Sequence, residues 1–381
     1  MLKRILAIRR KITWFWHYPC PIKQRLYVTR DFIHMHRIKG ITREEYYNYE
    51  FENRSTQFKY SFLGINEQTY YLNVLNPIKY YSFARNKYLT HKLLEDAGVR
   101  KAILYCYYQP AGVFNDADRI ASNHDGVKRI LKRQGVTQCV IKATESSHGE
   151  NVLVVNKLVY HDNDVEMYLY DGKCILLSTL LTDAPLIFES VIKQSNQLSS
   201  FNESSINTIR FMTTLYPDGS ARIIAAFLKI GRVGRCVDNA GDGGNVDTSI
   251  DLASGMIQYA IRFDGWRHIS DIDRHPDSGC QLNGITINDW ERIKQEVIRF
   301  QQAFPYCKAV GWDIAITDNG PVVIEVNDFW DTTGQLFIRK GWRNEIRDCF
   351  LDWKRTDTDF AIRRPTIKIS PRHLQKIVSK A

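Results

Sequence analysis

Residues 309–327 read AVGWDIAITDNGPVVIEVN, and this stretch carries the clearest structural signal in the 381-residue chain. Two runs of alternating apolar residues flank Asp318-Asn319-Gly320, a combination typical of a β-hairpin. A three-residue loop, with Gly320 in the left-handed conformation, makes every opposed pair on one face apolar, whereas a two-residue loop would face Ile314 against Glu325. We therefore expect residues 312, 314 and 316 to pair with 326, 324 and 322.

The opposite face of this hairpin is acidic. In the expected register Asp313 lies directly opposite Glu325, about 5 Å apart at Cβ, and Asn327 follows one step along the same face. Two adjacent carboxylates repel each other unless a cation lies between them or one is protonated. Hard oxygen ligands suit Mg²⁺, so we predict a magnesium site at Asp313, Glu325 and Asn327. A solvated face that happens to carry acids is the alternative.

The bulk composition is that of a globular protein, with 44% apolar and 25% charged residues. No stretch approaches the ~20 apolar residues that span a bilayer, and the N-terminus does not resemble a cleavable secretion signal. The eight cysteines form no Cys-x-x-Cys pair and have no zinc-ligand spacing with histidine. We therefore expect reduced thiols and a cytoplasmic location.

The net charge of +10 is concentrated at the two ends of the chain. Residues 1–30 hold eight Lys and Arg, residues 363–381 hold six, and neither segment holds an acid. The ends thus carry more positive charge than the whole chain, which argues against a nucleic-acid-binding body. Residues 1–16 can form a basic amphipathic helix that either makes peripheral contact with an anionic membrane or docks on its own protein.

Periodicity predicts helices at Thr42–Tyr49 and 85–97, the second followed by Gly98 at the C′ position. Two β-rich regions are expected at about 138–182 and 205–264. A further helix should begin after an Asn288 N-cap, with Glu291 completing a capping box. Its apolar stripe predicts five buried side chains: Trp290, Ile293, Val297, Phe300 and Phe304.

Several polar residues stand where they can meet phosphate groups. Lys142 ends a short apolar strand, and backbone N–H groups of Ser147, His148 and Gly149 follow in a loop of small residues. Lys87 begins the helix at 85–97, where anions are favoured. Glu189 ends the apolar run 185–188. A plain turn and ordinary surface lysines are the alternatives.

The order of these parts resembles the ATP-grasp superfamily, which includes D-alanine–D-alanine ligase. Within it, the chain is most similar to the sugar-transfer-associated ATP-grasp group over about residues 40–340. The stretches that carry this closer likeness are 205–213, 231–234, 237–244, His275-Pro276 and 310–313. One departure is Gly311, where D-alanine ligases place an arginine that helps hold the acyl phosphate.

The resemblance implies an α+β ATP-grasp fold, in which two α+β subdomains clasp ATP between antiparallel sheets behind a mostly helical N-terminal extension. The expected parts are a basic N-terminal extension (1–75), an N-terminal subdomain with the phosphate-covering loop (76–190), a C-terminal subdomain with the metal site (191–350) and a basic tail (351–381). ATP and Mg²⁺ are the expected ligands.

The resemblance also assigns roles to residues. Lys87 and Lys142 would hold ATP phosphates under the loop of Ser147, His148 and Gly149. Glu189, with the hinge to Val191, would read adenine. Arg210 is the expected partner of the acyl phosphate, although a surface salt bridge is an equal alternative. Lys229, Arg232 and Arg235, beside a loop with five glycines, would receive an anionic substrate.

Three functions follow from this reading. The first is ligation of a carboxylate to an amine donor, on a small-molecule or glycan substrate of surface polysaccharide synthesis. The second is phosphorylation of a sugar or lipid-linked glycan, with Asp238 or Asp242 as general base. The third is a nucleotide-binding regulator without turnover. The identity of the substrates and the oligomeric state are left open.

Overall fold

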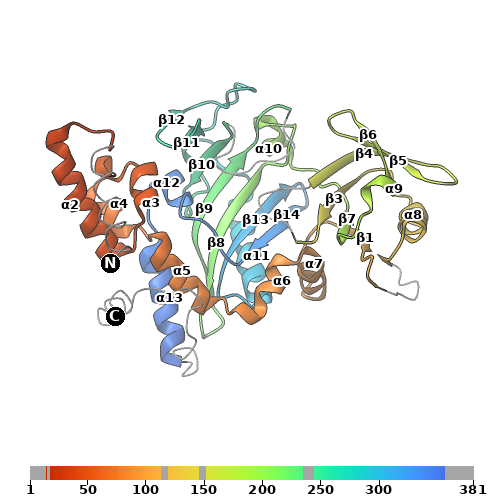
Figure 1. Cartoon of the computed structure of the whole chain (residues 1–381), viewed down its shortest axis with the longest axis horizontal. Coiled ribbons are helices and arrows are strands. Elements are labelled where there is room, and N and C mark those ends of the chain that lie inside the picture. The colour runs from red at the N-terminus through yellow and green to blue at the C-terminus, as the bar shows by residue number, and fades with distance from the viewer. Residues whose placement is uncertain (1–13, 15–17, 113–118, 146–151, 235–243, 357–381) are drawn as a thin grey trace, which may run out of the picture.

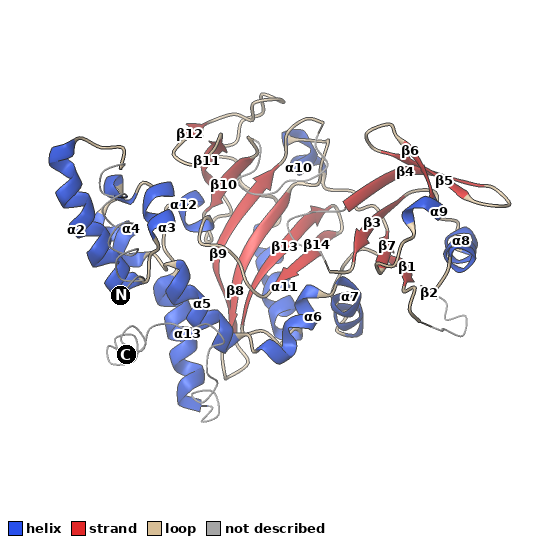
Figure 2. Cartoon of the chain, in the orientation of Figure 1, coloured by secondary structure: helices blue, strands red, loops and turns tan. Residues whose placement is uncertain are grey.

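The computed structural model describes residues 14, 18–112, 119–145, 152–234 and 244–356 (Figure 1). Two seven-stranded sheets form the α+β body, and helices gather at one end of the molecule and on the outer faces (Figure 2). Strands of the first sheet lie between residues 104 and 189, and those of the second between 208 and 327. The domain boundaries proposed from the sequence stay predictions.

The first sheet has the strand order β2-β1-β7-β3-β4-β5-β6. Only the pairing of β1 with β2 is parallel. Helices α8 and α9 pack on it around a core that includes Val127, Leu131 and Phe188. Its strands are β1 (Leu104–Tyr108), β2 (Ile120–Ala121), β3 (Cys139–Ala143), β4 (Val152–Tyr160), β5 (Val165–Leu169), β6 (Cys174–Leu176) and β7 (Leu186–Glu189), and the helices are α8 (His124–Arg133) and α9 (Leu177–Leu180).

The second sheet is antiparallel throughout, in the order β12-β11-β10-β9-β8-β13-β14. Helix α11 (Trp290–Ala303) covers one face, where Trp312 is completely buried against Phe300 and Phe304. The sheet consists of β8 (Thr208–Leu215), β9 (Ala221–Ile230), β10 (Val246–Ile250), β11 (Ile257–Phe263), β12 (Ile269–Ile272), β13 (Ala309–Thr317) and β14 (Gly320–Asn327). The two β-rich regions of the sequence are thus confirmed.

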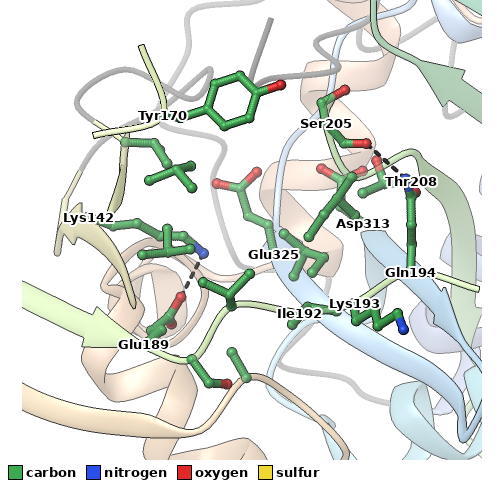
Figure 3. Close-up of a pocket in the computed structure, with 18 of the residues that line it drawn as sticks. Lys142, Tyr170, Glu189, Ile192, Lys193, Gln194, Ser205, Thr208, Asp313 and Glu325 are labelled. Atoms are coloured by element: carbon green, nitrogen blue, oxygen red, sulfur yellow. Dashed lines mark hydrogen bonds and ion pairs between the residues drawn. The ribbon is translucent and has the colours of Figure 1, made fainter. Parts of the chain in front are cut away.

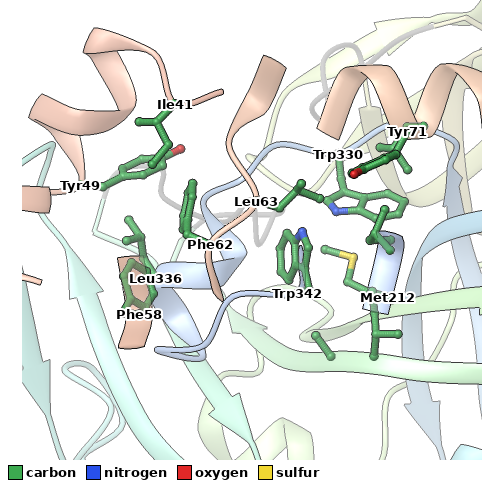
Figure 4. Packing of buried hydrophobic residues seen from close by; sticks show 14 of the residues in the cluster. Ile41, Tyr49, Phe58, Phe62, Leu63, Tyr71, Met212, Trp330, Leu336 and Trp342 are labelled. Carbon is green, nitrogen blue, oxygen red and sulfur yellow. The ribbon is translucent and has the colours of Figure 1, made fainter. Parts of the chain in front are cut away.

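The other face of the second sheet is shared between the N-terminal helices and an open cleft. Phe62 and Leu63 of the N-terminal region meet Trp330, Trp342 and the β8 side chain Met212 in one buried cluster (Figure 4). The helices around it are α2 (Ile22–Lys39), α3 (Arg43–Asn48), α4 (Thr56–Ser61), α5 (Ile65–Leu75), α12 (Gly334–Phe337) and α13 (Arg343–Thr356). This packing leaves the end of the sheet nearest the hairpin uncovered.

Three further helices border the cleft between the sheets: α6 (Tyr81–Arg85), α7 (Lys87–Asp96) and α10 (Asn196–Phe201). The predicted helix at 85–97 corresponds to α7, and Gly98 has the expected positive φ of 67°. The helix predicted at Thr42–Tyr49 is α3, which begins with a capping box of Thr42 and Glu45.

The predicted start of α11 is wrong by one residue. Asp289, not Asn288, is the N-cap, with a φ of 55° and no side-chain capping hydrogen bond. Because the helix begins one residue later than expected, Glu291 is its second residue and not the third, so a capping box with Glu291 does not form. The predicted apolar stripe is nevertheless buried in full, from Trp290 to Phe304.

The predicted register of the hairpin is correct near Asp313 and wrong nearer the turn. Trp312 pairs with Val326 and Asp313 with Glu325, as expected, but Ile314 pairs with Val323 and Ile316 with Pro321. The turn is the two-residue loop Asp318-Asn319, because Thr317 pairs with Gly320. An extra residue in β14, Ile324, shifts the register between Asp313 and Ile314. The turn and the bulge offset each other, which restores the predicted carboxylate pair.

All seven cysteines of the described part of the chain are free thiols, as their spacing predicted, and Cys236 lies outside it. None of the described helices is long and apolar enough to cross a membrane. The predicted helix at 1–16 lies outside the described residues except for Trp14, whose ring packs 4.9 Å from that of Phe32. Residues 357–381 of the predicted tail also lie outside them.

Candidate active site

A cavity of about 530 Å³ lies between the two sheets, a size that suits a nucleotide-sized ligand. The first sheet contributes Val140, Val152 and Val154 to its apolar wall, together with Lys142 and Glu189. The second sheet contributes three charged side chains: Lys229, Asp313 and Glu325. Side chains from both sheets therefore converge on one space (Figure 3).

The acidic pair of the hairpin points into this cavity. Asp313 and Glu325 are cross-strand neighbours on β13 and β14, and both line the wall. None of the described residues hydrogen-bonds or ion-pairs with the Glu325 carboxylate, which is half-buried. Asn327 lies further along β14 outside the lining, where its Nδ2 donates to the Gly311 carbonyl at 3.3 Å.

Asp313 is held by two cations. The Arg210 Nε donates to Oδ1 at 2.5 Å and the Nη2 to Oδ2 at 2.8 Å, while Lys229 Nζ lies 3.1 Å from Oδ1. Burial alone would raise the pKa of Asp313, but Arg210 and Lys229 together hold that pKa well below its usual range. The carboxylate is therefore ionised, and because Oδ1 meets both cations, only Oδ2 retains a lone pair for a further ligand.

Gly311 lies beside the Arg210 side chain. A Cβ atom at position 311 would lie 3.5 Å from the Arg210 Cδ and 3.4 Å from the Trp330 ring. Arg210, on β8, is the cross-strand partner of Asp313, and its guanidinium pairs directly with that carboxylate. A cation from the neighbouring strand therefore lies close to position 311.

The first sheet carries a buried chain of three charged or polar groups. Lys142 Nζ lies 2.7 Å from Glu189 Oε2, and His91 Nε2 donates to Glu189 Oε1 at 2.6 Å. Burial raises the pKa of Glu189, but Lys142 and then His91 reverse this and lower it to about 2. Both carboxylate oxygens are engaged, so Glu189 orients Lys142. Its predicted contact with adenine stays a prediction.

Lys87 and His91 lie one turn apart on α7, which brings both to the cavity side. The backbone N–H of Lys87 donates to the Thr144 carbonyl at 2.9 Å and ties α7 to the end of β3. Burial lowers the pKa of Lys87, the nearby Lys142 acts in the same direction, and Glu325 opposes them. The Lys87 ammonium group is thus influenced by the cation of Lys142 on the first sheet and by the anion of Glu325 on the second sheet.

The cavity collects most of the residues predicted from the sequence: Lys87, Lys142, Glu189, Val191, Lys229, Asp313 and Glu325. Ser147, His148, Gly149, Arg235, Asp238 and Asp242 lie outside the described residues. Sequence reasoning missed His91, Gln194 and Thr208. Helical spacing from Lys87 pointed toward His91, whereas nothing local marked Gln194, whose amide braces the Asn202 and Ser205 carbonyls.

The expected anion receptor near residue 231 is partly committed to internal contacts. Arg232 forms a bidentate pair with Asp277 at 2.7 and 2.6 Å, and this pairing raises the pKa of Arg232. His275 Nε2 lies 3.0 Å from the Gly231 carbonyl, within a buried position. Both contacts fasten the segment after β9 to residues 275–277.

Lys142 of the first sheet and Lys87 of α7 thus face Asp313 and Glu325 of the second sheet across this cavity. The family model for sugar-transfer associated ATP-grasp matches residues 66–349, and the chain belongs to this family. The α+β ATP-grasp fold expected from the sequence is therefore confirmed. Among curated proteins, none matches the sequence.

Solved structures with a similar fold share little sequence with this chain. Biotin carboxylase from Campylobacter jejuni has a TM-score of 0.43 and 11% identity, covering 73% of this chain and 48% of its own. D-alanine–D-alanine ligase from Bacillus anthracis has a TM-score of 0.40 and 13% identity, covering 74% and 72%. N5-carboxyaminoimidazole ribonucleotide synthetase from Thermotoga maritima has 0.40 and 10%, covering 73% and 52%. The chain spans about half the length of the first and third.

Proposed function

We propose that this protein is an ATP- and Mg²⁺-dependent ligase that joins a carboxylate to an amine, releasing ADP and phosphate. The observation that carries the proposal is the cavity itself, where Lys87 and Lys142 face Asp313 and Glu325. The family's association with sugar transfer supports a substrate from surface polysaccharide synthesis or modification, and the free cysteines support a cytoplasmic location.

Nucleotide binding is assigned to the cleft between the sheets. The ammonium groups of Lys87 and Lys142 would meet the phosphate oxygens, and the apolar wall of Val140 and Val154 would hold the base. A neighbouring fold, the ATP-grasp ligase PsnB, was solved with Mg and ADP. We infer the same pair of ligands here from the residues that line the cavity.

The residues present fit a magnesium ion. Asp313, Glu325 and Asn327 offer oxygen donors on one face of the hairpin, and Glu325 is not engaged by any described side chain. In the described part of the chain no group of three or more His, Cys, Asp or Glu is placed to bind a metal. Two carboxylates, an amide and the phosphates of ATP suit Mg²⁺, which when bound would neutralise phosphate charge.

The chemistry assigned to the chain is positioning and charge neutralisation. An oxygen of the substrate carboxylate attacks the γ-phosphorus of ATP, the bond to the β-phosphate oxygen breaks, and ADP leaves. The amine then attacks the acyl carbon, loses a proton and expels inorganic phosphate. Arg210 and Lys229 place two positive charges beside Asp313, where the acyl phosphate would carry its negative charge.

The kinase alternative gained its support from the missing arginine at position 311. The Arg210 side chain passes close to position 311, with its Cδ 3.5 Å from where a Cβ of residue 311 would lie, and this nearby cation supports the ligase over the kinase. The ligase reading requires an amine donor and the kinase reading does not. Phosphate release that depends on both a carboxylate and an amine therefore distinguishes the two.

The first test is nucleotide binding, measured as a shift in thermal unfolding with ATP and Mg²⁺. Ligand at about 100 times its Kd stabilises the folded state by about 2.7 kcal/mol. Glu325→Gln is the informative variant, because Asp313 also anchors Arg210 and Lys229 and its removal would disturb both. Glu291→Gln, an exposed acid on α11, is the control.

We expect the wild type and Glu291→Gln to show a Mg²⁺-dependent shift, and Glu325→Gln to lose the dependence on Mg²⁺. No shift with any nucleotide would sink the assignment. If ATP binds, ADP and phosphate release are then measured with pairs of carboxylates and amines.

A further inference from the structure

Helix α2 exposes an unusual number of apolar side chains for a surface helix. Ile22, Leu26, Tyr27 and Ile33 are 59%, 62%, 60% and 39% exposed, and they lie within one 18-residue helix. Isolated exposed apolar residues are common, but a group on one helix face marks a binding surface. We call this the outer face of α2.

Positive charge lies along the same face. Lys23, Arg30 and Arg37 are exposed and recur every seven residues, so they form a row along the helix. The row runs beside Ile22, Leu26 and Ile33, which follow a similar spacing. The single acid of α2, Asp31, is turned inward and paired with Lys59 Nζ at 2.6 Å. The outer face therefore carries no acidic side chain.

The inner side of α2 is anchored, so the exposed residues cannot turn inward. Val28, Phe32 and Met35 are buried in the N-terminal cluster, and the Phe32 ring packs 5.5 Å from that of Tyr46. The Tyr46 hydroxyl also donates to the paired Asp31 at 2.6 Å. Rotating the helix would break these contacts, and the orientation of the outer face is thus set by the core.

Helix α4 extends the surface with a second exposed tyrosine. Tyr60 is 48% exposed, its hydroxyl lies 3.0 Å from His34 Nε2, and Lys39 Nζ lies 5.3 Å from its ring. Tyrosines with an apolar ring and a wet hydroxyl are typical of the interface between a membrane and water. Tyr27 and Tyr60 thus lie beyond the basic row, on its side away from Ile22, Leu26 and Ile33, and supply groups suited to lipid headgroups.

We propose that the outer face of α2 binds the surface of an anionic phospholipid membrane, with the helix lying parallel to the bilayer. Apolar side chains would enter the headgroup region while the Lys and Arg side chains reach lipid phosphates. A second copy of the chain fits poorly, because two such faces repel each other. A nucleic acid would meet the basic row but leaves Ile22, Leu26 and Ile33 without a partner.

The location of α2 is compatible with catalysis at a membrane. The helix lies at the end of the molecule opposite the first sheet, so docking there leaves the cleft between the sheets uncovered (Figure 1). The sequence before α2 adds charge of the same sign, with five Lys and Arg and no acid in residues 1–17. The proposal does not depend on the ligase assignment.

The test is co-sedimentation of the full chain with vesicles of phosphatidylcholine alone and with phosphatidylglycerol added. An apolar variant is Ile22→Ser/Leu26→Ser/Ile33→Ser, and a charge variant is Lys23→Gln/Arg30→Gln/Arg37→Gln. Matched controls are Ile78→Ser, an equally exposed apolar residue, and Lys132→Gln/Lys157→Gln/Lys173→Gln in the first subdomain. Circular dichroism checks that each variant is folded.

We expect binding to vesicles with phosphatidylglycerol only, weakened about tenfold or more by each α2 variant and unchanged by the controls. Absence of binding to anionic vesicles would overturn the proposal. Loss in the charge variant with full binding by the apolar variant would also overturn it, since attraction through the basic ends or any basic patch explains that result. Equal losses in the control variants would locate the contact elsewhere.

Discussion

The buried carboxylate of Glu189 offers the sharpest test of how the site is built. Glu189 is 5% exposed, and its two oxygens contact Lys142 at 2.7 Å and His91 at 2.6 Å. These partners lower its pKa from 4.5 to about 2. A difference of that size corresponds to about 3 kcal/mol of folding stability at neutral pH, at about 1.4 kcal/mol per pH unit.

Glu189→Gln should therefore lower the free energy of unfolding by about 3 kcal/mol at pH 7, because the amide keeps the shape but leaves Lys142 without its counter-charge and His91 without its carboxylate acceptor. The pKa is depressed in the folded state, so the stabilisation is complete above the unfolded value of 4.5 and is lost as the pH falls toward about 2. The gap between the variant and the wild type should narrow over that interval.

Urea denaturation at a series of pH values measures both effects. Glu166→Gln is the matched control, an acid on β5 of the same sheet whose partners are the exposed Tyr168 and His161, and it should change stability by less than about 0.5 kcal/mol. A double-mutant cycle with Lys142→Met isolates the ion pair. A difference under about 1 kcal/mol at pH 7, or one that stays constant with pH, would refute the reasoning.

Three further predictions concern the cleft and the helical end. Arg210→Lys loses the bidentate contact with Asp313 and should slow the formation of ADP about a hundredfold or more, with little change in KM for ATP. The control Arg262→Lys should have no effect. A change in KM alone would contradict this prediction. Because burial lowers the pKa of Lys87, ATP affinity measured by calorimetry should decline with rising pH at a lower pH than it would for an ordinary lysine. Lys87→Met should remove that decline. A pH profile of ATP affinity that is unchanged in the variant would count against Lys87 as a phosphate ligand. Gly341→Ala places a methyl group on the Ser61 carbonyl and should lower the free energy of unfolding, measured in urea, by more than about 2 kcal/mol. In Gly311→Ala the nearest neighbour of the new methyl group is 3.4 Å away, so the free energy of unfolding should fall by less than about 1 kcal/mol. Equal losses would show that the helical end repacks freely.

The local chemistry of the chain predicted the elements that depend on near neighbours. Helix α7 and its end at Gly98 follow from apolar spacing and a glycine that tolerates positive φ. The pairing of Asp313 with Glu325 follows from alternation around a turn. The two errors at the same hairpin are also local: the turn is one residue shorter than expected, and Ile324 bulges from β14.

That bulge was beyond sequence reasoning because its cause is distant in the chain. The outer edge of β14 pairs with the segment after α7, where Val323 N donates to the Arg100 carbonyl at 2.9 Å and Lys101 bridges Val323. Ile324 meanwhile lines the cavity. The contacts on both sides of a strand select its register, and the periodicity of the sequence shows the contacts on only one side.

By itself, the sequence determined which residue types are available and which of them alternate onto a shared face. This was sufficient to predict the positions of the hairpin acids, of Lys142 at the end of β3 and of Lys87 at the start of α7. Tertiary structure alone decided the partners, which are His91 and Lys142 for Glu189, and Arg210 for Asp313. The physical reason is that periodicity acts over a few residues, whereas these ion pairs join strands and helices about 50 to 100 residues apart, and burial gives them their strength only after both sheets have packed.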